Sequence, residues 1–299
     1  MCTRMGAGLR EVYVEKFHLL PQTLTENDVS LLELHTTDIA RTHESLVSVM
    51  EGLYPADRRS GVYIPVAVTP SEITSGPLSC KRVFQLLALN LQSKEWVSRY
   101  QDLKPSLDQI NEICDAVNSS EFNTGYSAGG WPDVFHAREC HNMPLPCSQD
   151  GKTCVDDKMA DKVFDFTNWM TCRMFAGDEM NRLTSGAVFM GIADNFKSFV
   201  SSGKGPKYIH YSDHDTTIAM ALAALKYNCE SPPYASTLRF ELWQTESGSS
   251  PKYAVQIIYN NNVIRPPECS DNMCPLDDFL GMVKSRLTIH DPVKECQQK

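Results

Sequence analysis

The sequence predicts an α/β fold interrupted by a large helical insertion. Two segments, residues 29–53 and 207–225, each combine a buried strand, a tight turn and an amphipathic helix in direct succession. Between them, residues 69–205 show helical periodicity and no further convincing strand. We therefore expect an α/β domain formed by residues 1–70 and 206–299, with residues 71–205 inserted as a mainly helical cap.

The segment 207–225, KYIHYSDHDTTIAMALAAL, carries the strongest chemical signal. Its strand runs into a turn that contains Asp213, His214 and Asp215, and the helix behind the turn has an apolar face. Free N–H groups at a helix start favour an anion, so this turn predicts an oxyanion site with a general acid beside it. The alternative is structural: Asp213 or Asp215 caps the helix and His214 packs.

A second turn of the same kind follows residues 29–35, an apolar run of strand length. Thr37 or Asp38 is expected to cap the next helix, which places Arg41 in its first turn. Parallel strands open their carboxyl ends on one edge of a sheet, where α/β folds bind ligands. We therefore expect Arg41 and His214 at the same edge; the alternative for Arg41 is a solvated surface charge.

The remaining elements follow from the same patterns. Residues 7–17 are expected to form a helix, and residues 62–68, with an internal proline, a short or edge strand. Residues 236–244 and 252–259 predict an antiparallel hairpin, followed by a terminal helix at residues 276–286. Within the insertion, helices are expected at residues 83–103, 107–117, 163–175 and 186–200, and a loop rich in Gly, Pro and Cys at residues 127–154.

The composition limits the classes of partner. Lysine and arginine total 28 against 37 aspartates and glutamates, a formal net charge of -9, so no nucleic-acid partner is expected. A phosphorylated substrate stays possible because a few convergent arginines suffice to bind it. No segment approaches the ~20 apolar residues needed to cross a bilayer, so we expect no membrane span.

The chain contains eleven cysteines, which indicates an oxidising compartment. Short spacings suggest pairing Cys269 with Cys274 and Cys147 with Cys154, each closing a small polar loop. Zinc is the weaker alternative, because no CxxC occurs and the histidines are not interleaved at ligand spacing. Asn118 begins a glycosylation sequon, which agrees with secretion, yet the first residues lack the apolar region of a signal peptide.

Five motifs together resemble histidine acid phosphatases, the branch of the histidine phosphatase superfamily that contains prostatic and lysosomal acid phosphatase. YSDHDTT resembles the family's YSAHDTT, TTDIARTHESLVSVMEGLYP resembles STDxDRTLMSAxxNLxGLFP, PPYASTLRFEL resembles PPYASCHLFEL, NRLTSGAVF resembles RLxGGxLL, and CSDNMCPLDDF resembles CxxxCPLxxF. The motifs follow the family's order over essentially the whole chain. The resemblance implies a doubly wound, mostly parallel sheet of the phosphoglycerate mutase-like type with a helical cap, no metal or other cofactor, and often a homodimer.

The resemblance also implies roles for individual residues. Asp215 would donate a proton to the leaving alcohol, and His214 and Arg41 would bind phosphate oxygens. The implied disulfides are Cys269–Cys274, Cys140–Cys229 and Cys80–Cys296, which leaves Cys2, Cys114, Cys147, Cys154 and Cys172 outside the family framework.

The sequence departs from the family at its nucleophile, a histidine in an RHGxRxP motif that forms a phosphohistidine. No RHG occurs, and the opening residues CTRMGAGLREVYVEKF resemble a family segment downstream of that motif. His35 stands where relatives have arginine, and Asp213 replaces a small residue beside the proton donor. We therefore expect a truncated chain that is inactive as written and lacks the first, central strand, which would lie next to the strand ending at Ser212.

These observations predict an acid phosphatase-like phosphomonoester hydrolase, secreted or endolysosomal, that acts on a small phosphorylated substrate or a phosphoprotein. The alternative is a pseudophosphatase that binds phosphate or a partner without turnover, although retention of Arg41, His214 and Asp215 argues against it. A metal hydrolase using His210 and the turn at residues 213–215 is weaker still, because side chains along one strand and turn cannot all converge on one ion.

Overall fold

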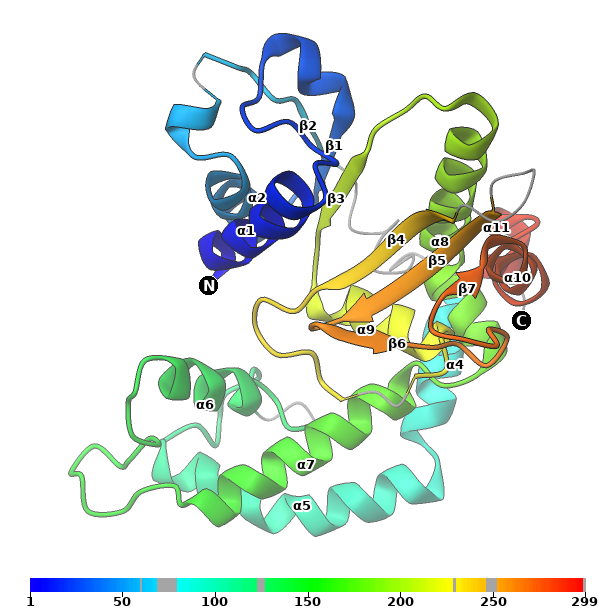
Figure 1. The fold of residues 1–299 in the computed structure, drawn as a ribbon. Helices are drawn as coiled ribbons and strands as arrows, with labels where there is room; N and C mark the ends of the chain where they lie inside the picture. Colours follow the sequence, from blue (N-terminus) through cyan, green and yellow to red (C-terminus); the bar gives the residue numbers. More distant parts are fainter. Residues whose placement is uncertain (60, 69–79, 123–126, 228–229, 246–251, 298–299) are drawn as a thin grey trace. The chain divides into compact units, whose positions relative to one another are not determined.

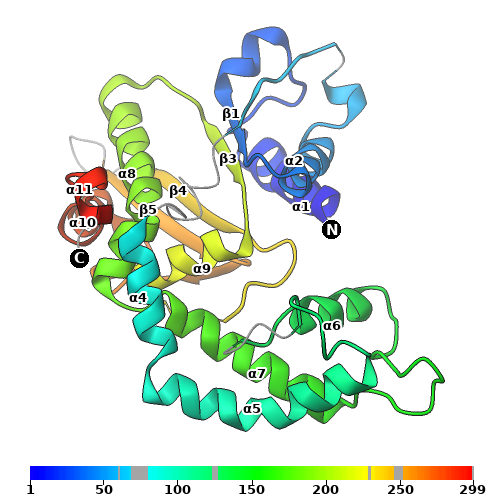
Figure 2. The ribbon, with the colours of Figure 1, turned by 180° about the vertical axis from the view of Figure 1, so that it is seen from behind.

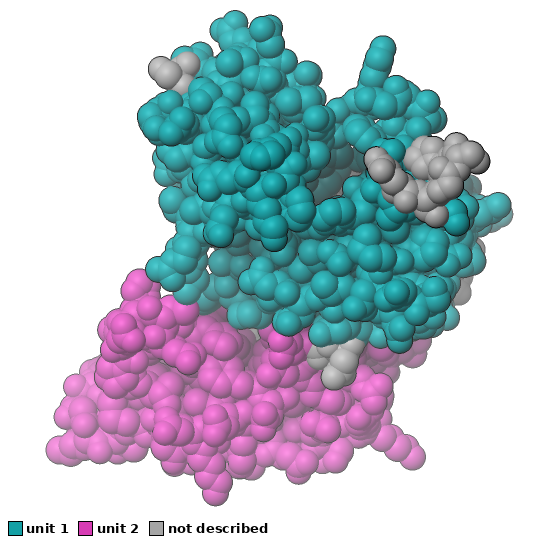
Figure 3. Space-filling view, viewed as in Figure 1, with its two compact units in different colours: residues 1–83, 177–227, 232–299 teal, residues 84–176, 228–231 magenta. Residues whose placement is uncertain are grey.

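The chain has a mixed α/β fold, which confirms the predicted class. The computed structural model describes residues 1–59, 61–68, 80–122, 127–227, 230–245 and 252–297. The chain divides into two compact units: unit 1 comprises residues 1–83, 177–227 and 232–299, and unit 2 comprises residues 84–176 and 228–231 (Figure 3). Among the described helices, none combines the length and apolarity required to cross a membrane.

The first part of unit 1, blue in Figure 1, contains the first predicted strand-turn-helix. Its elements are α1 (Cys2–Arg10), a π-helical segment (Glu11–Lys16), a 3-10 segment (Glu26–Leu31), β1 (Leu32–Thr36), α2 (Ala40–Leu53), a 3-10 turn (Ala56–Arg58) and β2 (Val66–Val68). β1 begins later than expected because Thr25 and Asp28 form a capping box that starts the 3-10 segment. The expected capping of α2 by Thr37 or Asp38 is wrong, since Ile39 takes that position without a side-chain bond.

Helices α1 and α2 cross at two glycines. A Cβ atom built on Gly6 would lie 2.0 Å from the backbone oxygen of Val49, and one built on Gly52 would lie 2.0 Å from that of Thr3. The two backbones therefore touch where they cross, with no room for a side chain on either helix. The contact fixes the position of α2, which carries Arg41 at its other end.

A three-stranded parallel sheet brings the two predicted turns together. β1 lies between β2 and β3 (Tyr208–Ser212), and β2 forms an edge, as the internal proline indicated (Figures 1 and 2). The register pairs Thr36 with Ser212, the last residues of β1 and β3. The turns after β1 and β3 therefore open on the same edge, as predicted. Within the described residues, β3 pairs with β1 alone.

The rest of unit 1 contains an antiparallel sheet and its covering helices. The strands are β4 (Leu238–Thr245), β5 (Lys252–Tyr259), β6 (Asn262–Ile264) and β7 (Cys274–Pro275), and the helices are α8 (Asp178–Ser202), α9 (Asp215–Ala224), α10 (Leu276–Met282), a π-helical turn (Val283–Leu287) and α11 (Pro292–Gln297). β4 and β5 form the predicted hairpin, with β6 and β7 both on β5. The sequence did not predict β6 or β7, which are only three and two residues long.

Unit 2 is helical, as the periodicity predicted. Its elements are α4 (Lys81–Leu91), which starts in unit 1, α5 (Lys94–Ile113), α6 (Trp131–Cys140) and α7 (Asp157–Met174). The expected helix 83–103 is broken at Ser93, whose hydroxyl accepts a bond from the Trp96 N–H and so caps α5. The expected loop 127–154 contains α6, whose Trp131 donates its indole N–H to Asn111 at 2.8 Å.

The expected insertion, residues 71–205, is longer than unit 2, because α8 packs in unit 1. Asn181 on α8 donates to the Ala223 carbonyl of α9 at 3.2 Å. A Cβ atom on Gly186 would lie 2.4 Å from the backbone oxygen of Leu287. These close contacts pack α8 against α9 and against the π-helical turn Val283–Leu287.

Three expected disulfides are present, and one is not. The bonds Cys269–Cys274, Cys147–Cys154 and Cys80–Cys296 are formed. The expected bond between Cys140 and Cys229 is wrong, because Cys140 is a free thiol exposed at the end of α6. Cys229 itself lies outside the described residues. Among the cysteines left without an expected partner, Cys172 is disulfide-bonded, and Cys2 and Cys114 are free.

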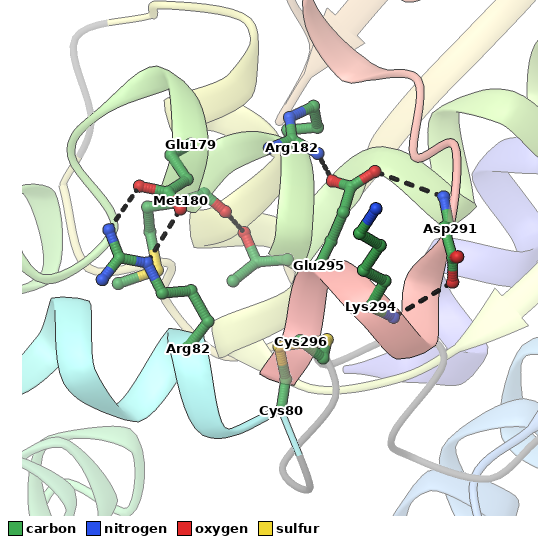
Figure 4. Close-up of a disulfide and its surroundings, with 10 residues drawn as sticks. Cys80, Arg82, Glu179, Met180, Arg182, Asp291, Lys294, Glu295 and Cys296 are labelled. Carbon is green, nitrogen blue, oxygen red and sulfur yellow. Dashed lines mark hydrogen bonds and ion pairs between the residues drawn. A yellow bond between two sulfur atoms is a disulfide. The ribbon is translucent and has the colours of Figure 1, made fainter. Parts of the chain in front are cut away.

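The Cys80–Cys296 bond lies among ion pairs that connect the same segments (Figure 4). Arg82 binds Glu179 through two hydrogen bonds of 2.8 Å each, and Arg182 pairs with Glu295. A bidentate arginine–carboxylate pair fixes direction as well as distance. The start of α4, the start of α8 and α11 are therefore held together by a covalent bond and by charge.

Strand β3 carries a histidine that should make folding stability depend on pH. Burial lowers the pKa of His210 to about 4, and the Tyr208 hydroxyl, 2.7 Å from Nδ1, bonds to the neutral ring. The unfolded chain, with an ordinary histidine pKa near 6.5, then binds a proton that the folded chain does not. Stability should therefore fall as pH drops from about 6.5 to about 4, by roughly 3 kcal/mol, and stay level for this group below that.

Urea unfolding between pH 7 and pH 4 measures this loss. In His210→Gln the loss between pH 6.5 and pH 4 should shrink by roughly the amount assigned to His210. His43→Gln, on the exposed surface of α2, is the matched control, and its free energy of unfolding should depend on pH as it does in the unaltered protein. The same pH dependence in all three proteins would contradict the assignment to His210.

Candidate active site

Arg41 and His214 meet at the edge where β1 and β3 end. Arg41 lies in the first turn of α2, and His214 is the N-cap residue of α9. Arg41 Nη2 is 3.4 Å from His214 Nδ1, although the residues are 173 positions apart in sequence. A guanidinium and an imidazole that meet where the N-termini of α2 and α9 approach each other form an electropositive position suited to an anion.

The two carboxylates of the turn make different contacts. Asp213 accepts bonds from the His214 backbone N–H at 2.9 Å and from the Thr217 hydroxyl at 2.8 Å, so it shapes the turn. Asp215 is exposed in the first turn of α9, and its Oδ1 accepts the Thr216 N–H at 2.8 Å. Asp215 Oδ2 has no bonding partner among the described residues. It is therefore available to exchange a proton with an incoming group.

Buried hydroxyl groups on the α2 side of the site were not predicted as functional. Thr37 Oγ1 is 3.3 Å from His214 Nε2 and 2.8 Å from Thr42 Oγ1. Ser212 donates to the Thr42 carbonyl at 2.7 Å and so ties the end of β3 to the start of α2. The signal in the sequence was Thr37 directly after the strand, a position that by itself indicates only a candidate helix cap.

His35, which stands at an arginine position of the resembled family, lies on β1 beside the site. Its Nε2 is 2.7 Å from Glu33 Oε1, and its ring stacks on Tyr211 with centroids 4.5 Å apart. Burial, and then the charge of Glu33, raise the pKa of Tyr211 above its ordinary value. His35 thus belongs to a polar cluster on the face of the sheet that bears Glu33 and Tyr211.

The other sequence-predicted groups lie apart from this turn or do not cluster. Asn118 is exposed in the turn that follows α5 in unit 2. His210, named in the metal alternative, bonds to Tyr208 within β3. The described residues include no group of three or more His, Cys, Asp or Glu side chains placed to hold a metal ion. The structure therefore brings together Arg41 and His214, and Asp215 follows His214 directly in the sequence.

Comparisons with known sequences give one consistent result. The sequence model of branch 2 of the histidine phosphatase superfamily matches residues 2–260. Counting factor 60 of Dictyostelium discoideum is 28% identical over 295 residues, which cover 95% of this chain and 66% of that protein. Lysosomal acid phosphatase of Bos taurus is 28% identical over 283 residues, which cover 88% of this chain and 64% of that protein. The chain thus spans just under two thirds of the length of these curated relatives.

A comparison with solved structures supports the same fold. The apo form of the phytase of Hafnia alvei matches with a TM-score of 0.67, covering 100% of this chain and 87% of that chain. The two sequences are 16% identical, so this similarity concerns the fold alone.

Proposed function

This chain belongs to branch 2 of the histidine phosphatase superfamily, and from this premise we propose that it forms the phosphate-binding and proton-donating part of a phosphomonoester hydrolase. Arg41 and His214 bind the phosphate, and Asp215 protonates the leaving alcohol. The reaction has two steps: a histidine attacks phosphorus while the ester oxygen leaves with the proton, and water then cleaves the phosphohistidine. The substrate class is a small phosphorylated molecule or a phosphoprotein.

The convergence of Arg41 and His214 carries the proposal. They come from separate strand-turn-helix units, yet their nitrogen atoms lie 3.4 Å apart. Arg41 is exposed and can turn its fork of N–H groups toward phosphate oxygens, a geometry that guanidinium matches well. An anion at this position would also meet the N-terminus of α9, where the helix dipole favours negative charge.

We propose that the attacking histidine is neither His35 nor His210, the two histidines on the strands of the parallel sheet. His35 bonds to Glu33, and His210 bonds to Tyr208 and is neutral. Within the described residues, β3 pairs on one side with β1, and β4 pairs with β5 but not with β3. An additional strand at the edge of β3 would end beside His214 and would present a nucleophile there.

Phosphate binding to the 299-residue chain tests the proposed site. In Arg41→Ala, the dissociation constant of inorganic phosphate measured by calorimetry should rise at least tenfold, the value of one charge-assisted hydrogen bond. Arg58→Ala, which removes an exposed arginine just beyond α2, is the matched control and should change the constant less than twofold. Equal weakening in both variants would indicate general charge attraction and would contradict a site at Arg41.

The compartment is proposed from the cysteines and the relatives. The described disulfides form and persist in oxidising compartments. A relative is named lysosomal acid phosphatase. We therefore propose a secreted or endolysosomal location, with Asn118 as a glycosylation site. A homodimer is a possible assembly that the family resemblance alone implies.

A further inference from the structure

Both ring nitrogens of His214 have a defined partner. Nδ1 faces Arg41 Nη2 at 3.4 Å, and Nε2 faces Thr37 Oγ1 at 3.3 Å. A guanidinium group has donors only, so Nδ1 must accept the bond from Arg41. The neutral ring then carries its proton on Nε2 and donates it to Thr37.

The Thr37 hydroxyl is itself part of an ordered chain of hydrogen bonds. Its oxygen is 2.8 Å from Thr42 Oγ1, and Thr42 Oγ1 donates to the Ile39 carbonyl at 2.7 Å. A carbonyl can only accept, so the Thr42 proton points to Ile39 and Thr37 must donate to Thr42. Thr37 is therefore left with its lone pairs for the Nε2 proton of His214.

This chain of bonds is buried and rigid. Thr36, Thr37 and Thr42 are 2%, 2% and 3% exposed. Thr36 Oγ1 also contacts Thr42 Oγ1 at 3.0 Å, but does not reach His214. Ser212 bonds to the Thr42 backbone and so fixes β3 against α2. Buried bonds of this kind are costly to leave unmade, which holds each hydroxyl in one orientation.

We propose that Thr37 is a positioning residue for His214: it accepts the Nε2 proton and thereby holds the ring with Nδ1 toward Arg41. In the unliganded protein Nδ1 accepts from Arg41, and in the protonated ring Nδ1–H donates to an anion bound there while Nε2–H stays on Thr37. The consequence for phosphate rests on the proposed function, whereas the proton on Nε2 is a property of the unliganded protein. Thr37 touches neither phosphate nor the reacting atoms. It acts through His214.

The first test is the nitrogen-15 NMR spectrum of the imidazole groups in the 299-residue chain at a pH where His214 is neutral. The His214 ring should show a protonated Nε2 and an unprotonated Nδ1, with an Nε2 proton signal protected from exchange with water. In Thr37→Val, which removes the acceptor and keeps the shape, that signal should broaden or disappear. Thr37→Ser, which restores the hydroxyl, should recover it.

Thr36→Val is the matched control, because Thr36 is equally buried, bonds to the same Thr42 and does not contact His214. It should leave the Nε2 signal unchanged. A proton on Nδ1 in the unaltered protein would overturn the inference, and so would equal loss of the signal in both valine variants. Thermal unfolding of each variant shows whether the fold is kept, and Thr37→Ser keeps the test decisive if Thr37→Val unfolds.

The second readout is phosphate affinity. The dissociation constant should rise about 2–12-fold in Thr37→Val, the range of one neutral hydrogen bond, and should stay within twofold in Thr37→Ser and Thr36→Val. If the NMR pattern is as expected but neither the unaltered chain nor any variant binds phosphate, the proposed function is refuted and the positioning role stands. If phosphate binds with the same dissociation constant in Thr37→Val and in the unaltered chain, only the positioning role is refuted.

Discussion

Replacing Asp215 with asparagine is expected to lower kcat for an alkyl phosphate by about 10²–10⁴-fold, the usual contribution of a general acid. Asparagine keeps the size of the side chain and the bond from Thr216 N–H to its oxygen, but it has no proton to give to the leaving alcohol. The loss should be much smaller for p-nitrophenyl phosphate, whose leaving group needs little protonation. This dependence on the leaving group separates proton donation from a general loss of structure.

The assay uses two proteins, the 299 residues alone and a chimera in which they follow the N-terminal segment of a relative, the lysosomal acid phosphatase of Bos taurus. We expect turnover only in the chimera, whose added segment would supply the histidine nucleophile of the family. Asp277→Asn is the matched control, because Asp277 is also exposed in the first turn of a helix, α10. Turnover by the 299 residues alone that depends on Asp215 would contradict our placement of the nucleophile. Phosphate binding without turnover in either form would favour the pseudophosphatase.

Replacing Gly6 with alanine is expected to destabilise unit 1 by about 3 kcal/mol or more, at the upper end of the cost of overpacking. The added methyl group would lie 2.0 Å from the Val49 oxygen and 2.9 Å from the Gly52 Cα atom. Both obstacles are backbone atoms, so α1 and α2 would have to move apart. Urea unfolding measures the loss, and weaker phosphate binding should accompany it because α2 carries Arg41.

Gly8→Ala on the same helix is the control. A Cβ atom there meets nothing within 4 Å, so the change should stabilise the protein by up to about 1 kcal/mol through helix propensity. A loss of stability in Gly6→Ala together with a gain in Gly8→Ala would confirm that α1 and α2 touch at Gly6 and Gly52. A loss of similar size at both positions would indicate a different packing of α1.

The success of sequence-based prediction depended on how local each signal was. The strand 208–212 was predicted with the bounds of β3, and the hairpin of β4 and β5 was also found, because alternation and turn chemistry are encoded within a few residues. Helix α6 was missed because the pair of Gly129 and Gly130 before it and Pro132 in its first turn are typical of a loop. What stabilises it is distant, namely the bond from Trp131 to Asn111, twenty positions away.

The same distinction applies to the candidate site. Arg41 and His214 were predicted because each follows a strand, and parallel strands end on one edge. Thr37 was interpreted as a helix cap, the role that local sequence offers a threonine before a helix. Its hydroxyl instead bonds to a ring 177 positions away, which only the folded chain reveals.

The bond between Cys80 and Cys296 has a further consequence for the response of the protein to proteases. It joins residues 216 positions apart, so residues 84–176 of unit 2 lie within a covalent ring. A protease that cuts one peptide bond within the ring opens it without releasing a fragment. The nicked protein remains one molecule of unchanged composition until a reductant separates its pieces. The disulfide bond thus keeps the protein in one piece after a single proteolytic cut, in addition to the free energy of folding that limits cutting in the first place.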